Sequence, residues 1–126
     1  MGLKGSVETV MRSPPVTVLF SDTVSSVTEK MVSNNIGAVI VMSGGSPTGM
    51  VTERDIVRKV VRDRKDPSRT RAQEIMSIPL VLIEADRSVR DALRLMGDTE
   101  IRRLAVTRGG RLVGIVTERR LLDSLV

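Results

Sequence analysis

Hydrophobic and polar positions along this chain follow one pattern that occurs twice, 65 residues apart. Residues 49–56 return as residues 114–121, and both segments begin with Gly-x-Val-Thr-Glu-Arg. The same offset, without a gap, aligns Met11 with Met76 and the pair Gly44-Gly45 with Gly109-Gly110. A repeat this regular indicates the duplication of one supersecondary unit. Because there are two copies, we expect a closed pair that buries one face against the other, rather than an open solenoid.

The first copy predicts a short helical turn followed by strand, helix, strand, strand and helix. Residues 38–42 form a continuous apolar run, typical of a strand covered on both faces. Gly44-Gly45 predicts a tight turn into the next strand. Asp22-Thr23 can cap the first helix, whose apolar residues follow a helical spacing: Val24, Val27, Met31 and Val32. The second helix is expected to begin at Thr52 and to place four residues on its inner face: Ile56, Val57, Val60 and Val61.

The second copy repeats these elements after a charged linker at residues 64–71. Thr70-x-x-Gln73 predicts a capped helix start, and Ser88-x-x-Asp91 predicts another. A helical crossover implies parallel strands, whereas the Gly-Gly connection implies an antiparallel hairpin. Each copy should therefore form a small mixed sheet with both helices on one face. The predicted fold class is α/β, with an α+β mixed sheet.

The composition removes several classes of function. The chain has 126 residues, one aromatic side chain (Phe20), no cysteine and no histidine. Disulfides and thiol chemistry are excluded, histidine-based acid–base catalysis is excluded, and a transition-metal site is not expected. Neither a membrane span nor the apolar segment of a secretory signal is present. We therefore expect a cytoplasmic protein without a membrane partner.

The net charge of +5 is concentrated between the repeats. Residues 58–71 contain seven Lys or Arg residues against two acids, Asp63 and Asp66, so this segment alone carries 7 − 2 = +5. One interpretation is a solvated helix end and linker. The other is a patch that binds anions or nucleic acid.

Two βαββα units, each opening with Met-x-x-Pro and closing on Gly-x-Val-Thr-Glu-Arg, resemble a pair of cystathionine-β-synthase (CBS) domains, known as a Bateman module. The resemblance covers residues 7–63 and 72–126, with residues 64–71 as the linker. It implies two tandem repeats packed as a pseudo-twofold pair. It also implies a non-enzymatic regulatory or sensor module that binds an adenosyl ligand in the cleft between the repeats. That ligand would be AMP, ADP, ATP or S-adenosylmethionine, with no other cofactor. A homodimer through the helices and a protein partner acted on in trans are further expectations.

Thr52 and Asp55 have two interpretations. Local physics favours a capping box, because Thr at the N-cap with an acid three residues later stabilises the first helical turn. The resemblance implies in addition that Asp55 accepts the ribose hydroxyls of the ligand and that Thr52 lines the same site. A carboxylate can accept two such hydrogen bonds.

The second copy departs from this pattern, because Arg120 stands where the first copy has Asp55. Arginine cannot accept a hydrogen bond from a sugar hydroxyl, so the cleft containing Thr117 and Arg120 is expected to be degenerate. By resemblance, the phosphates would be bound by the paired Arg102 and Arg103 and by Arg119. Each of these arginines could equally be a solvated surface residue.

Adenine, by resemblance, would contact a set of small and apolar residues: Pro15, Val16, Ile36, Gly37 and Ala38. The alternative is that these are plain core and turn residues. Two other classes of function also stay open. One is a nucleic-acid-binding module that uses the basic linker and the arginines of the second repeat. The other is an enzyme, against which stand the missing histidine and cysteine and the absence of a P-loop.

Overall fold

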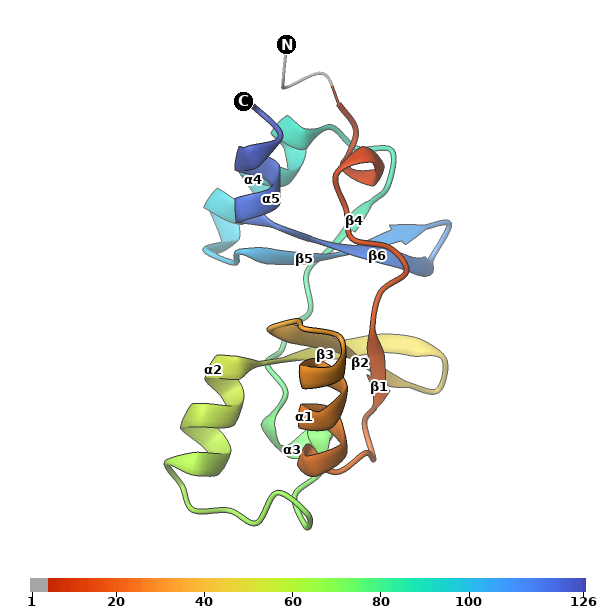
Figure 1. Cartoon of the computed structure of the whole chain (residues 1–126). Coiled ribbons are helices and arrows are strands. Elements are labelled where there is room, and N and C mark those ends of the chain that lie inside the picture. The colour runs from red at the N-terminus through yellow and green to blue at the C-terminus, as the bar shows by residue number, and fades with distance from the viewer. Residues whose placement is uncertain (1–4) are drawn as a thin grey trace. The chain divides into compact units, whose positions relative to one another are not determined.

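The predicted strands form two three-stranded mixed sheets, one in each of two compact units (Figure 1). The computed structural model describes residues 5–126. Unit 2 is Val16–Leu80, and unit 1 combines the chain up to Pro15 with Val81–Val126. The leading segments of the repeats are residues 7–15 and 72–80. Each unit therefore joins the body of one repeat to the leading segment of the other. The predicted α/β class is confirmed.

Unit 2 has a helix, a π-helical turn and two short helices around its sheet. Its elements are β1 (Thr17–Leu19), α1 (Val24–Ser33), β2 (Ala38–Ser43), β3 (Ser46–Thr52), α2 (Glu53–Ile56), a π-helical turn (Val57–Val61) and α3 (Ala72–Ile75). Strand β2 is central, parallel to β1 and antiparallel to β3. Figure 1 shows α1 and α2 on the same side of this sheet, as predicted.

Unit 1 repeats the arrangement. It contains a 3-10 turn (Val7–Thr9), β4 (Leu82–Glu84), α4 (Val89–Thr99), β5 (Arg103–Arg108), β6 (Arg111–Thr117) and α5 (Glu118–Asp123). Strand β5 is parallel to β4 and antiparallel to β6. The hairpin turns of both units have two glycines with positive φ, +58° and +81°, as a primed two-residue turn requires. Each hairpin also has an irregularity at the corresponding place, after Val41 and after Val106.

The core of each unit is aliphatic. In unit 2 the buried face of α1 packs on β2 and β3, and the fully buried residues include Val24, Val27, Val39 and Val51. In unit 1 the equivalent positions are filled by Val89, Ala92, Leu104 and Val116. With 40% hydrophobic residues and one aromatic, the chain builds both cores from Val, Ile, Leu, Met and Ala side chains.

Three of the predicted helix starts, at Thr23, Thr52 and Ser88, are confirmed, and the one at Thr70 is wrong. Thr23 caps α1 by accepting from Ser26 N, and Ser88 caps α4 by accepting from Asp91 N. The start predicted at Thr70 is displaced by one residue, because α3 begins at Ala72. Thr70 is buried, and its hydroxyl donates to the carbonyl of Asp66 instead.

The predicted inner face of the second helix is also partly wrong. Val60 is buried, but Val57 and Val61 are 58% and 66% exposed. The reason is a π-helical turn, in which Arg62 N donates to Val57 O and Lys65 N donates to Val60 O, each across five residues. The wider turn changes the direction of the following side chains relative to an α-helix.

The leading segments are tied to the body of the unit in which they lie. In unit 2, Ser77 N donates to Met50 O at 2.7 Å, and Met50 N donates back to Ser77 O at 3.2 Å. In unit 1, the same pair of bonds joins Arg12 and Ile115 at 2.8 and 3.1 Å. These contacts place Ser77 beside β3 and therefore near the start of α2.

Candidate functional site

The start of α2 is a complete capping box. The Thr52 hydroxyl accepts from Asp55 N at 3.2 Å, and Asp55 Oδ2 accepts from Thr52 N at 2.9 Å. Asp55 Oδ2 also accepts from the Thr52 hydroxyl at 3.0 Å. The capping interpretation of this pair is therefore confirmed, and these bonds satisfy two N–H groups that a helix start otherwise leaves unpaired.

The other oxygen of Asp55 is bound by two residues that the sequence did not single out. Ser77 Oγ donates to Asp55 Oδ1 at 2.7 Å. Lys59 Nζ lies 3.1 Å from the same oxygen and donates to Ile75 O at 3.0 Å. Asp55 itself is 5% exposed. A buried carboxylate is thus held by donors from the end of β3, from the π-helical turn and from the segment after α3.

These contacts keep Asp55 ionised. Burial opposes the charged form, but the hydrogen bonds from Ser77, from Thr52 and from Lys59 together outweigh it. They hold the pKa of Asp55 below its ordinary value of 3.8. At neutral pH the site therefore presents an acceptor-only group, suited to hydroxyls, amides and cations.

In unit 1 the equivalent helix start has lost its acid. Thr117 still caps α5 by accepting from Arg120 N at 3.2 Å. Arg120 Nε donates to Val10 O at 2.7 Å, across 110 residues of sequence. Val10 aligns with Ile75, so a cation bonds the corresponding carbonyl in both units, from Lys59 in one and from Arg120 in the other. Arg120 therefore keeps the link between helix and leading segment without a carboxylate.

Three predicted phosphate-binding arginines lie in unit 1. Arg102 directly precedes β5 and is 81% exposed at its side chain, with Nε 3.8 Å from Glu118 Oε1. Arg103 is half-buried and pairs in register with Thr117. Arg119 is exposed in the first turn of α5. These three residues and Thr117 thus lie where β5 begins, β6 ends and α5 begins.

Four of the five predicted adenine-contacting residues lie in unit 2, and two of these, Gly37 and Ala38, lie next to the start of α2. Ala38 pairs in register with Thr52, and Gly37 O accepts from Glu53 N at 3.0 Å. Ile36 and Gly37 help to line a cavity of about 380 Å³, together with residues of α1, of the loop after it and of α2: Thr28, Met31, Val32, Asn35, Glu53 and Ile56. Asp55 does not line this cavity. Val16 begins unit 2 and its carbonyl accepts from Ile40 N, whereas Pro15 ends the leading segment of unit 1.

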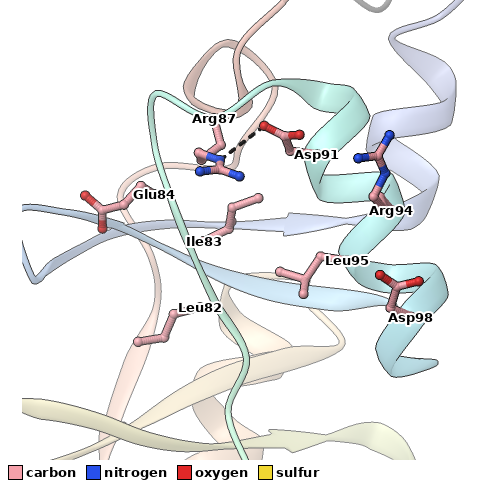
Figure 2. Close-up of a pocket in the computed structure, with 8 residues that line it drawn as sticks. All are labelled: Leu82, Ile83, Glu84, Arg87, Asp91, Arg94, Leu95 and Asp98. Atoms are coloured by element: carbon pink, nitrogen blue, oxygen red, sulfur yellow. Dashed lines mark hydrogen bonds and ion pairs between the residues drawn. The ribbon is translucent and has the colours of Figure 1, made fainter.

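A second hollow, of about 370 Å³, lies in unit 1 between β4 and α4 (Figure 2). Three of its charged groups, Arg87, Asp91 and Glu84, have partners within the unit. Arg87 Nε donates to Asp91 Oδ2 at 3.1 Å, and Glu84 accepts from Thr107 Oγ1 and from Gly109 N. Arg94 and Asp98 follow along the same helix (Figure 2). No predicted site residue lines this hollow, and its paired charges are accounted for by the stability of α4.

Lys59 could have been found from the sequence, whereas Ser77 could not. Lys59 follows Asp55 by four residues, the spacing at which opposite charges meet on a helix. Ser77 is separated from Asp55 by 22 residues and belongs to the other sequence repeat. Across residues 5–126, no group of three or more acidic, cysteine or histidine side chains is placed to hold a metal ion. Nor does this part of the chain contain a helix with the length and hydrophobicity to cross a membrane.

Comparison with known proteins gives the family. The CBS domain matches this chain twice, at residues 7–62 and 72–126. The chain belongs to the CBS-domain family. A protein of Methanopyrus kandleri is 39% identical over 120 residues, which cover 94% of this chain and 61% of that protein. A relative in Methanocaldococcus jannaschii is matched over 31% of its length, so this CBS pair spans only part of these longer relatives.

Solved structures of CBS proteins share the fold. A crystal structure of hypoxic response protein I with two coordinated zinc ions aligns with a TM-score of 0.82 and 28% identity, covering 94% of this chain and 98% of that one. A hexameric CBS-CP12 protein from bloom-forming cyanobacteria aligns with a TM-score of 0.85 and 32% identity, covering 94% of this chain and 71% of that one. The predicted tandem CBS repeats are therefore confirmed.

Proposed function

We propose that this CBS pair is a non-enzymatic sensor that binds an adenosyl ligand, with AMP, ADP and ATP as the first candidates and S-adenosylmethionine as another. The observation that carries the proposal is the ionised Asp55 carboxylate at the start of α2, beside the Gly37–Ala38 peptide. In this proposal Asp55 accepts the ribose hydroxyls, and Thr52 orients the carboxylate through two of its bonds. Hydrogen bonds from hydroxyls to a charged acceptor are about twice as strong as neutral ones.

The proposal extends to partners and location. A regulated protein acted on in trans, a homodimer through the helices and a cytoplasmic location are all parts of it. The exposed valines of unit 2 support association, since Val32 of α1 and Val57 and Val61 of the π-helical turn leave apolar surface on the helices. The hexameric state of the CBS-CP12 protein is a property of that protein. For this chain, light scattering would measure the oligomeric state, with a dimer as the expected result.

Titration calorimetry with AMP and adenosine tests the proposed site. Wild type is expected to bind both ligands saturably, and Asp55→Asn is expected to weaken both by at least about tenfold, because it removes a charged acceptor of similar shape. Asp63→Asn is the matched control, since it neutralises an exposed acid whose contact is with Arg62. Absence of saturable binding by wild type, or equal binding by Asp55→Asn and wild type, contradicts the proposal.

The role of the paired arginines stays a prediction, and it has its own measurement. Replacing Arg102 and Arg103 together with alanine is expected to remove most of the preference for AMP over adenosine. Charge-assisted contacts to phosphate contribute about 1.5–3 kcal/mol each. Adenosine affinity should stay close to that of wild type. A double variant that keeps its preference for AMP would show that these arginines do not bind the phosphate.

The basic segment gives a prediction that separates the sensor from a nucleic-acid-binding module. Residues 66–70 bond to the start of α1, because Pro67 O and Thr70 O accept from Ser25 N and Val24 N. This part of the linker therefore has a structural role. Neutralising Arg62, Arg64 and Lys65 together is expected to leave AMP affinity within about twofold. A larger loss of AMP binding, or salt-sensitive binding of RNA or DNA that this variant loses, would instead favour the basic patch as a binding surface.

A further inference from the structure

Asp55 has its acceptor positions filled by groups of this chain. Oδ2 accepts from the amide and the hydroxyl of Thr52, and Oδ1 accepts from Ser77 Oγ and Lys59 Nζ. A carboxylate offers about four lone-pair positions. A ligand hydroxyl can therefore bond to Asp55 only by taking the place of one of these donors.

The donors differ in how much their departure would cost. The two Thr52 bonds belong to the capping box that begins α2. Lys59 also donates to Ile75 O, so its departure would leave that carbonyl and the buried carboxylate without their cation. Breaking any of these three bonds would therefore cost more free energy than breaking the bond from Ser77.

Ser77 is the donor that can leave most easily. It is an exposed residue, and its hydroxyl can turn toward water by rotation about one side-chain bond. Its backbone stays in place during that rotation, because it is paired with Met50 in both directions. The bond that is broken, from a hydroxyl to a carboxylate, is also chemically the same as the bond that a ribose hydroxyl would form.

We propose that Ser77 is a built-in competitor for the ribose-accepting oxygen of Asp55 and thereby raises the ligand concentration to which the sensor responds. This inference rests on the proposed function. A ligand hydroxyl that displaces Ser77 Oγ exchanges one hydrogen bond for another. The ligand binds only the state in which Ser77 has turned away, so its apparent affinity is reduced by the fraction of molecules in that state. Unit 1 changes both members of the pair together, with Arg12 at the position of Ser77 and Arg120 at that of Asp55.

Calorimetry with adenosine tests the competition directly. Ser77→Ala removes the competing donor and is expected to bind adenosine about three- to tenfold more tightly than wild type, the range set by the net value of one hydrogen bond. Ser77→Thr retains the hydroxyl and should bind as wild type does. Ser68→Ala is the matched control, because it removes another 2.7 Å bond from a serine hydroxyl to an aspartate, in the linker.

The outcomes separate this inference from the proposed function. If Ser77→Ala binds as wild type does or more weakly, while Asp55→Asn weakens binding by at least about tenfold, the competition is wrong and the adenosyl site stands. If wild type binds neither adenosine nor AMP, both are wrong. Should Ser77→Ala fail to fold, Ser77→Cys keeps the side-chain shape with a weak donor, and it too must bind adenosine more tightly.

Discussion

Gly114→Ala is expected to lower the free energy of unfolding by about 1–3 kcal/mol, the range typical of overpacking in a well-packed interior. A Cβ atom at this position in β6 would lie 2.5 Å from Met11 Sδ and 2.9 Å from the carbonyl oxygen of Arg12. The methionine can move, but the carbonyl belongs to a backbone segment that is bonded to Ile115 in both directions. The leading segment must therefore shift away from β6.

Urea unfolding measures this loss, and two other glycines serve as comparisons. Gly49→Ala is expected to cost less, because its Cβ would meet chiefly the flexible Met76 side chain at 2.7 Å and a carbonyl at 3.1 Å. Gly97→Ala meets nothing within 4 Å in α4 and should stabilise the protein by about 0.5–1 kcal/mol. If Gly114→Ala were as stable as wild type, the close packing of Met11 and Arg12 against β6 would be contradicted.

Asp55→Ala is expected to lower the free energy of unfolding by about 2 kcal/mol at neutral pH. The substitution removes the acceptor of the Thr52 amide and hydroxyl bonds, and it frees the Ser77 hydroxyl and Lys59. The loss is smaller than that of breaking a fully buried ion pair, because the Lys59 side chain is 41% exposed and can be rehydrated. The matched comparison is Asp91→Ala, which removes the more exposed acid of the α4 start and should cost clearly less, because solvent screens that charge.

The same carboxylate gives this effect a pH dependence. Because the folded protein lowers the pKa of Asp55 below 3.8, its stabilising contribution is fully present above that value. The contribution is lost as the pH falls through the folded pKa. The difference in unfolding free energy between wild type and Asp55→Asn should therefore be constant near neutrality and shrink below pH 3.8. A difference that stays unchanged in acid would mean that the charge of Asp55 does not stabilise the fold.

The helix starts show how far sequence reasoning reaches. Thr23, Thr52 and Ser88 each bond to an amide three residues along the chain, so the cap follows from spacing alone. Thr70 has the same spacing to Gln73, yet it is buried and donates to Asp66 instead. The linker folds back on α1, and this tertiary contact outweighs the local preference. Capping rules state which residue types can cap a helix, while tertiary packing decides whether such a residue has its side chain free to do so.

The exposed positions of the second helix show a different limit. Val57 and Val61 fit the apolar spacing of an α-helix together with Ile56 and Val60, and the sequence alone predicts all four inside. A π-helical turn widens the spacing, so Val60 is buried while Val57 and Val61 are exposed. Nothing in the local sequence marks that turn. Within it, Lys59 contacts both Asp55 and Ile75 O, and Val60 is buried in the core.

The sequence by itself determined the duplication, the order of elements, the α/β class and the loss of the acid at Arg120. Each of these depends on residue type and short spacing, which a linear pattern records. The tertiary structure decided which leading segment joins which unit, and it brought Ser77 to Asp55 and Arg120 to Val10 O. The two leading segments share the Met-x-x-Pro pattern and pack against equivalent glycines, Gly49 and Gly114. Local sequence preference therefore does not determine which unit each segment joins. Which segment joins which unit depends on contacts between residues far apart in the chain, and the spacing of neighbouring residues does not reveal the free energy of such contacts.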